Sequence, residues 1–204
     1  GYDSAGISII VKDKLKTIKS VGKICELEKL TNNLEYSNMG IGHTRWATHG
    51  GVTLENAHPH TVGKVTLVHN GIIENYRELK NELNYKDYKS ETDSEVAAAL
   101  INECFTNDPI KAISEATKRI KGSYALLIMF EGINKLYAVR KGSPLIIGLG
   151  KEENFVASDI TAILKYTKKY YEMNELEIFE INSNKVKIYN KNLDLITKKA
   201  KEAE

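Results

Sequence analysis

Cysteine and proline are scarce in this sequence of 204 residues, which has two cysteines and three prolines. Cys25 and Cys104 are too few for a disulfide framework, and the first residues show no secretory leader pattern, so we expect a protein of the reducing cytoplasm. With 42% hydrophobic and 27% charged residues, the composition is typical of a folded chain and excludes disorder as its main state.

Long apolar runs and an excess of one charge are also lacking. No window of about 18 consecutive apolar residues occurs, so no membrane-spanning helix is predicted. Lysine and arginine number 29 against 27 acidic residues, and a net charge of +2 gives no basic field for nucleic acid or anionic lipid. The sequence therefore predicts neither a membrane protein nor a nucleic-acid-binding protein.

The spacing of apolar residues changes along the chain. Residues 5–11 are typical of a strand, and from residue 122 onward apolar runs joined by short polar turns predict three hairpins, over 124–140, 144–158 and 176–189. Between 74 and 121 the spacing becomes helical. Helices grouped between antiparallel strands predict an α+β fold with helices layered on sheet.

Three helices are expected between residues 74 and 121. The first covers 74–85, where apolar side chains recur at helical spacing. The second begins after Thr92, with Glu95 three residues later as its capping-box partner. The third begins after Asp108, and Gly122 is expected as its C-terminal stop.

All five histidines and the one tryptophan lie between residues 43 and 69. They are His43, Trp46, His49, His58, His60 and His69. Random placement would rarely group them so closely, and loops between strands are where sites are usually built. The sequence therefore predicts a functional site in this segment.

Three features of this region and its surroundings each allow two interpretations. Arg45 either packs on the ring of Trp46 or forms a bidentate clamp on a carboxylate. The Asn70–Gly71 pair is either a turn or an oxyanion hole that combines a side-chain amide with a backbone N–H. Asp93 is either a helix N-terminal residue stabilised by the dipole or the partner of an ammonium group.

The histidines also allow a rival interpretation in which they bind a zinc-type metal. The three imidazoles would come from His58 and His60 together with His43, His49 or His69. Carboxylates are scarce nearby and the spacing matches no metal motif, so hydrogen-bonding histidines are favoured over a metal site. Neither cysteine has an electropositive setting, so neither is expected to act as a nucleophile.

Seven ordered motifs resemble the glutaminase domain of the glucosamine-6-phosphate synthases, which are class II glutamine amidotransferases and N-terminal nucleophile hydrolases. The motifs are GYDSAGIS, GHTRWATHG, NAHPH, VHNGIIENY, SETDSE, RKGSPLIIGLG and ENFVASD. The resemblance implies a four-layer αββα sandwich of two antiparallel sheets. It assigns 1–190 to an amidotransferase type 2 domain that lacks its first residues, and 191–204 to a linker toward a sugar isomerase domain.

The resemblance also implies an activity and residue roles. The parent enzyme would be a homodimer without cofactor or metal that converts D-fructose 6-phosphate and L-glutamine to D-glucosamine 6-phosphate and L-glutamate. Arg45 would hold the α-carboxylate of glutamine and Asp93 its α-ammonium, while Asn70 and Gly71 would form the oxyanion hole. The residues that would line the pocket are Trp46, Thr48 and His49.

The sequence departs from the resembled family at the nucleophile. That family uses an N-terminal cysteine, about thirty residues before the position of Gly1, whose α-amine acts as the base for its thiol. We therefore expect this chain alone to hydrolyse nothing. The alternatives are a non-catalytic glutamine-binding module and, third, a His-rich metal hydrolase.

Overall fold

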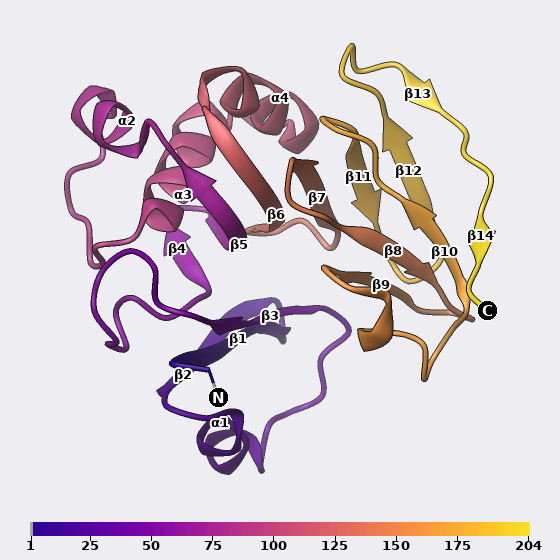
Figure 1. Cartoon of the computed structure of the whole chain (residues 1–204), viewed down its shortest axis with the longest axis horizontal. Helices are drawn as coiled ribbons and strands as arrows, with labels where there is room; N and C mark the ends of the chain where they lie inside the picture. Colours follow the sequence, from indigo (N-terminus) through magenta and orange to yellow (C-terminus); the bar gives the residue numbers. More distant parts are fainter. Residues whose placement is uncertain (1) are drawn as a thin grey trace.

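The computed structural model describes residues 2–204 as helices and antiparallel sheets arranged in layers (Figure 1). The helices are α1 (Ile24–Thr31), α2 (Tyr76–Glu82), α3 (Asp93–Cys104), α4 (Pro109–Arg119) and the 3-10 turn η1 (Ile160–Ala162). The strands up to the middle of the chain are β1 (Ser4–Val11), β2 (Lys14–Val21), β3 (Gly40–Arg45), β4 (His60–Val62), β5 (Val65–Ile73), β6 (Gly122–Phe130) and β7 (Leu136–Lys141). The remaining strands are β8 (Ile146–Leu149), β9 (Asn154–Ala157), β10 (Lys169–Glu172), β11 (Ile178–Ile181), β12 (Val186–Tyr189), β13 (Leu195–Ile196) and β14 (Lys201–Glu202).

A seven-stranded sheet in the order β13-β12-β11-β7-β6-β5-β4 forms the centre of the molecule. Its longest ladder joins β5 to β6 over nine residue pairs, from Val65 opposite Phe130 to Ile73 opposite Gly122. Two of the predicted hairpins, β6–β7 and β11–β12, belong to this sheet, and β8–β9 is the third. All three hairpin predictions are therefore confirmed.

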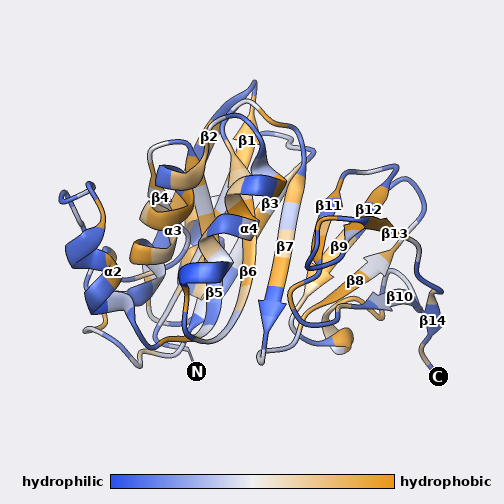
Figure 2. Ribbon diagram, turned by 90° about the horizontal axis from the view of Figure 1, so that it is seen from above, coloured by the Kyte–Doolittle hydropathy of each residue, from blue (hydrophilic) through white to orange (hydrophobic). Residues whose placement is uncertain are grey.

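Helices α3 and α4 cover one face of this sheet. Side chains of β6 alternate in direction, and Leu126 and Ile128 pack with Leu100 and Ile113 of the two helices in one fully buried cluster. In Figure 2 the ribbon of β7 is mostly orange, the colour of apolar residues, with a pale band along it and a blue C-terminal tip. The buried helix-on-sheet layer is the main hydrophobic core of the described residues.

Two smaller sheets cover the opposite face. The three-stranded sheet β2-β1-β3 packs through Ile41 against Val68 and Met129, and the four-stranded sheet β14-β10-β8-β9 packs through Ile147 against Ala138. Helix α1 lies beyond the three-stranded sheet, on its side away from β5–β7 (Figure 1). The layers therefore follow the order helix, sheet, sheet, helix.

The α+β class and the antiparallel pairing predicted from the sequence are confirmed, and so is the layer order that the resemblance implies. The structure differs in that the second β layer is divided between two sheets. A cavity of about 240 Å³ separates them, lined by Gly42 and His43 from β3 and by Val156 and Ala157 from β9. Among residues 2–204, no strand pairs with those two edges, so the sheets do not merge.

The helix boundaries follow the predicted capping residues at the N-termini more closely than at the C-termini. Thr92 caps α3 by accepting the N–H of Glu95, and Asp108 caps α4 by accepting the N–H of Lys111. The expectation that Gly122 ends the third helix is wrong, because α4 ends at Arg119 and Gly122 begins β6. Gly122 has φ +119°, and a Cβ there would lie 2.1 Å from a backbone oxygen of β5.

The C-terminal residues 191–204, expected to form a linker, contribute two short strands. β13 pairs with β12 in the central sheet, and β14 pairs with β10 in the four-stranded sheet. Lys201 also contacts Glu172 at 2.6 Å, and Lys198 forms an ion pair with Glu177. This segment therefore packs along the edges of both sheets.

The longest helix among residues 2–204 is α3, with 12 residues. A helix needs about 20 apolar residues to cross a bilayer. No helix in the described part of the chain has the length and apolar character that this requires.

Candidate functional site

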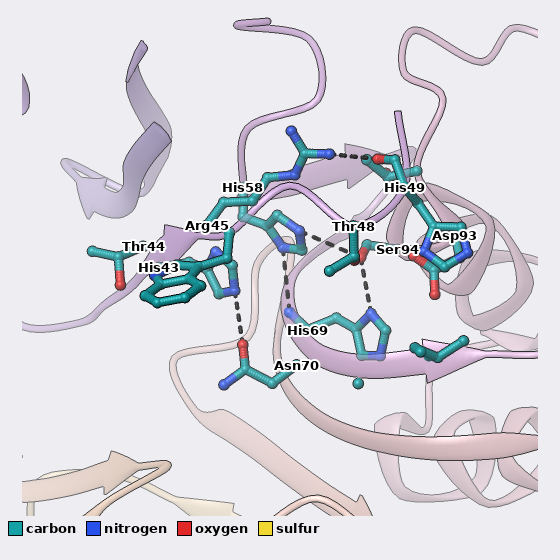
Figure 3. Close-up of a pocket in the computed structure, with 14 residues that line it drawn as sticks. His43, Thr44, Arg45, Thr48, His49, His58, His69, Asn70, Asp93 and Ser94 are labelled. Carbon is teal, nitrogen blue, oxygen red and sulfur yellow. Dashed lines mark hydrogen bonds between the residues drawn. The ribbon is translucent and has the colours of Figure 1, made fainter. Parts of the chain in front are cut away.

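A cavity of about 370 Å³ opens where the end of β3, the middle of β5 and the start of α3 meet (Figure 3). All seven site residues predicted from the sequence line it, although they are spread over 49 positions of the chain, from 45 to 93. They are Arg45, Trp46, Thr48, His49, Asn70, Gly71 and Asp93. The fold thus brings together residues whose proximity the sequence could only suggest by resemblance.

The Asn70–Gly71 pair lies inside β5, so its interpretation as a turn is wrong. Both residues remain paired with β6, opposite Ala125 and Tyr124, and both are exposed toward the cavity. A turn signal is overridden here because the nine-residue ladder with β6 holds the backbone extended. The pair therefore presents a side-chain amide and a backbone N–H from a fixed strand.

The direction of the Gly71 N–H follows from its neighbours along β5. The N–H of His69 donates to His58 Nδ1 at 3.4 Å. The N–H of Ile73 donates to Asp93 Oδ2 at 2.8 Å. Both leave β5 on the side away from β6, and since N–H groups alternate along a strand, the N–H of Gly71 points to that side as well. It is therefore directed into the cavity.

Position 71 accepts only glycine. Its φ is +120°, a conformation that side chains rarely adopt. A Cβ at this position would lie 2.1 Å from the carbonyl oxygen of Ser123 and 2.9 Å from Ser143 Oγ. The close approach of the β6 backbone thus requires a residue without a side chain beside Asn70.

Asp93 occupies the first position of α3 and is buried, with 5% of its surface exposed. Its Oδ2 atom accepts the N–H of Ile73, which fixes the carboxylate against β5. The helix N-terminus also favours a negative charge at this position. The dipole and ligand interpretations made from the sequence are compatible, because the fixed carboxylate lines the cavity.

Arg45 is buried, with 4% of its surface exposed, and its guanidinium donates to carbonyl groups of the loop that follows β3. Nη1 donates to Gly51 O at 2.9 Å, and Nη2 donates to the carbonyl oxygens of His49 and Gly50. Burial lowers the pKa of Arg45, while the carboxylates of Asp3, Asp93 and Glu91 raise it. The guanidinium therefore shapes the loop wall of the cavity and lies in the field of three carboxylates.

The same loop is held from its other side by Glu91 and Asn56, whose roles the sequence analysis missed. Glu91 Oε2 accepts from the Gly51 N–H and from Asn56 Nδ2, both at 3.1 Å. Asn56 Oδ1 accepts the Glu91 N–H at 2.8 Å. The Asn56 bond, followed by the Gly51 bond, holds the pKa of Glu91 below its usual value. Both residues belong to the motifs NAHPH and SETDSE, but neither their type nor their spacing indicates this contact.

Trp46 does not pack on Arg45. Trp46 is 68% exposed, and its ring meets that of Tyr2 edge-on, with 5.9 Å between the ring centroids. His49 packs edge-on against Tyr76 at 5.6 Å. The interpretation of Arg45 and Trp46 as a stacked pair is therefore wrong, and Trp46 forms an exposed rim of the cavity.

Three buried histidines form hydrogen bonds to hydroxyl groups at the start of α3. His69 Nδ1 lies 2.9 Å and His58 Nε2 lies 3.4 Å from Ser94 Oγ, and His60 Nε2 lies 3.1 Å from Thr92 Oγ1. Burial is the largest cause that lowers the pKa of His60 to about 3 and that of His69 to about 4, and it holds the pKa of His58 well below 6.5. These imidazoles are therefore neutral at pH 7.

The rival metal interpretation has no geometric support. The nitrogens Nδ1 of His69 and Nε2 of His58 and His60 contact hydroxyl groups. Across residues 2–204, no group of three or more His, Cys, Asp or Glu side chains is arranged to hold a metal ion. Cys25 is exposed on α1 and Cys104 is half-buried on α3, and neither lines the cavity.

Residues 43–165 match the family described as "Glutamine amidotransferase domain". The chain is 50% identical over 196 residues to glutamine–fructose-6-phosphate aminotransferase (isomerizing) of Aquifex aeolicus, which covers 93% of this chain and 33% of that protein. It is 45% identical over 204 residues to the protein of the same name from Clostridium perfringens, again covering 33% of that protein. The chain thus spans about one third of the length of these curated relatives.

Two solved structures resemble the fold. Glutamine phosphoribosylpyrophosphate amidotransferase of B. subtilis, complexed with ADP and GMP, superposes with a TM-score of 0.80 at 28% identity, over 96% of this chain and 44% of that one. A glutamine aminotransferase class-II domain protein from Silicibacter pomeroyi superposes with a TM-score of 0.68 at 16% identity, over 92% and 91% of the two chains. The second likeness shows the fold alone.

Acidification is expected to destabilise the protein through its buried histidines. His60 is neutral when folded and is protonated below pH 6.5 when unfolded, so its contribution is present above 6.5 and is lost as the pH falls toward about 3. At pH 5 this single group, with a pKa lowered from 6.5 to about 3, accounts for a loss of about 2 kcal/mol. Urea denaturation at pH 7 and pH 5 measures the free energy of unfolding.

The variant His60→Gln should show a smaller decrease in the free energy of unfolding between pH 7 and pH 5 than the wild type. Thr92→Val is the matched control, because it removes the hydroxyl partner of His60 and keeps the imidazole. It should lower stability at both pH values and keep the wild-type difference between them. An equal pH dependence in His60→Gln and the wild type would contradict the assignment.

Proposed function

The chain belongs to the glutamine amidotransferase domain family, and we propose that its cavity binds glutamine and stabilises the oxyanion formed when the side-chain amide is hydrolysed to glutamate and ammonia. The observation that carries this proposal is the placement of Asn70 and Gly71 on the same cavity as Arg45 and Asp93. Asn70 and Gly71 can stabilise the oxyanion of an acyl transfer, and the charges of Arg45 and Asp93 can bind the α-carboxylate and α-ammonium of an amino acid.

The α-carboxylate and α-ammonium of glutamine need one cationic and one anionic partner. Arg45 supplies a guanidinium whose terminal nitrogens already donate to loop carbonyls and which has further N–H groups for a carboxylate. Asp93 supplies a carboxylate that is already fixed by the Ile73 N–H. Among residues 2–204, Oδ1 of Asp93 has no hydrogen-bond partner, which leaves it for an ammonium group. Both charges are buried, so each interaction is stronger than it would be at the surface.

Attack on the amide carbonyl converts its oxygen to an oxyanion. Two donors aimed at that oxygen lower the barrier, because they stabilise a charge that is absent from the ground state. The Asn70 amide and the Gly71 N–H are such donors, and both lie on a central strand whose position does not depend on the substrate. The strand geometry therefore supports preorganised stabilisation of the oxyanion.

The attacking thiol is expected from the N-terminal cysteine that the resemblance implies, since neither Cys25 nor Cys104 lines the cavity. Burial raises the pKa of Cys104, which further disfavours its thiolate. The described residues thus supply substrate binding and oxyanion stabilisation. They leave nucleophilic attack to the N-terminal segment.

We also propose that the complete protein transfers the released ammonia to D-fructose 6-phosphate and forms D-glucosamine 6-phosphate. This proposal is supported by the names of the relatives from Aquifex aeolicus and Clostridium perfringens, at 50% and 45% identity. The chain aligns with one third of each, so a sugar isomerase domain would lie outside the aligned part. A homodimer of the complete enzyme belongs to the same proposal.

The proposed function is tested with the complete gene product. It should release glutamate from glutamine and, with fructose 6-phosphate present, form glucosamine 6-phosphate in equal amount. Glutamate release without the amino sugar would keep the glutaminase and overturn the sugar acceptor. Absence of both products from a folded protein would overturn the proposed function.

Arg45→Ala should raise the KM for glutamine by an amount equivalent to about 2–5 kcal/mol, because it removes one partner of a buried charge pair. Arg45→Lys keeps the charge but loses the fork, so its KM should fall between those of the wild type and the alanine variant. Arg119→Ala is the control, since Arg119 pairs with Glu82 away from the cavity. The clamp assignment fails if the KM of Arg45→Ala equals that of the control.

Asn70→Ala should lower kcat about 10²–10³-fold and change the KM for glutamine much less, because the lost donor acts mainly in the transition state. Asn33→Ala, an exposed substitution after α1, is the matched control. Steady-state glutaminase kinetics separate the two constants. A large rise in KM with unchanged kcat would instead assign Asn70 to ground-state binding.

A further inference from the structure

A hydrogen bond between two layers holds the side chain of Asn70. Nε2 of His43, on β3 of the three-stranded sheet, lies 2.8 Å from Oδ1 of Asn70, on β5 of the central sheet (Figure 3). Both residues line the cavity. Nothing in the sequence motifs assigns a role to His43, which lies two positions before Arg45.

The orientation of the Asn70 amide implies which nitrogen of His43 carries the proton. Because an amide oxygen only accepts hydrogen bonds, Oδ1 at 2.8 Å from Nε2 corresponds to the tautomer in which Nε2–H donates. Burial is the largest influence on the pKa of His43 and lowers it, although bonds to the Asn70 side chain and to the His69 backbone raise it, so the ring is neutral at pH 7. His43 is thus a neutral imidazole that donates from Nε2.

The ring of His43 is itself held in place. It stacks on His58, with ring centroids 3.9 Å apart and planes inclined by 21°. His58 is fixed in turn by the N–H of His69 and by Ser94 Oγ. Its carbonyl oxygen lies against β1, where a Cβ at Gly6 would come within 1.9 Å of it. His43 therefore donates from a packed position with little freedom to turn away.

This donor distinguishes the two orientations of the Asn70 amide. The oxygen and nitrogen ends of an asparagine are nearly equal in size, so sterics alone do not select between them. With Oδ1 held by His43, Nδ2 takes the opposite end, and Figure 3 shows it directed away from His43. The reversed amide would turn an oxygen toward a developing oxyanion and repel it.

We propose that His43 is a positioning residue that orients the Asn70 amide so that Nδ2 faces the reacting oxygen. This inference rests on the proposed glutaminase function for its kinetic consequence. His43 touches neither the substrate nor the reacting atoms in this role. It acts through the carboxamide oxygen of Asn70.

Kinetics of the complete gene product test the role. His43→Phe keeps an aromatic ring for stacking and removes the donor, and it should lower the glutaminase kcat about 10–100-fold, with KM changed less than about twofold. His43→Gln places an amide donor near the position of Nε2 and should recover most of the lost kcat. Equal losses in the Phe and Gln variants would overturn the proposal.

A double-mutant cycle separates positioning from general structural damage. In an Asn70→Ala background, His43→Phe should change kcat less than about twofold, because its only route of action is gone. His60→Phe is the matched control, since this buried histidine contacts Thr92 and not Asn70. The fold-decreases in kcat caused by His60→Phe and by Asn70→Ala should multiply in the double variant. If the fold-decreases caused by His43→Phe and by Asn70→Ala also multiply, the positioning role is overturned.

A spectroscopic measurement decides the inference independently of activity. In protein with ¹⁵N-labelled imidazoles, the resonances of His43 at pH 7 should show a protonated Nε2 and an unprotonated Nδ1. The Asn70 side-chain amide signals should shift in His43→Phe and return in His43→Gln. An unprotonated Nε2, or Asn70 side-chain signals that do not shift in His43→Phe, would overturn the proposed orientation of the Asn70 amide. If both shifts occur and the wild type does not hydrolyse glutamine, the proposed function fails while the orientation of Asn70 stands.

Discussion

The β5–β6 ladder is the constraint on which the site depends. Nine consecutive pairs hold β5 extended from Val65 to Ile73, and both faces of the strand are covered by other layers. The side chains of β5 therefore point alternately toward the helices and toward the second β layer. Every second N–H group of β5 points away from β6, to the edge where β4 pairs with residues 65–67 alone. The uncovered part of that edge, beside His69, Gly71 and Ile73, forms the floor of the cavity.

The remaining walls are tied to this strand by polar contacts. The start of α3 is joined to it through Asp93 and Ser94. The loop after β3 is joined to the approach to α3 through Glu91 and Asn56. Because one short segment, 91–94, serves both walls, a displacement of α3 would change the loop and the carboxylate together. The site is thus a property of the layer packing as much as of its motifs.

Sequence patterns predicted the helices and strands that have a clear local signal, such as alternating apolar residues or a capping residue. The hairpins alternate apolar and polar residues, and Thr92 and Asp108 carry local capping signals, so these predictions needed no tertiary information. The strand β2 was missed because its lysines give it a polar pattern, and α1 was missed because Leu27 is its only buried residue. Asn70–Gly71 was ambiguous because its turn propensity is overridden only by the ladder with β6.

The roles of the site residues could be predicted only through resemblance. They lie up to 48 positions apart, and no helix or strand periodicity relates residues at that separation. For a related reason, the roles of Glu91 and Asn56 were missed, and His43 was considered only as a possible metal ligand. Their roles consist of contacts with Gly51, with each other and with Asn70, and such contacts exist only once the layers are assembled. Residues that hold other residues carry no signature of their own in a single sequence.

The charges of the cavity also depend on burial more than on composition. Four of the five histidines line it, yet burial lowers the pKa of His43, His58 and His69, and the positive field of Arg45 also lowers that of His43 and His58. Among the described residues that line the cavity, Arg45 is the only lysine or arginine and Asp93 the only acidic residue. Because His43, His58 and His69 stay neutral, they add no cation that competes with the guanidinium or that pairs with the carboxylate. A cavity with one fixed cation and one fixed anion is complementary to a zwitterion, and it would lose that complementarity if the buried histidines were charged.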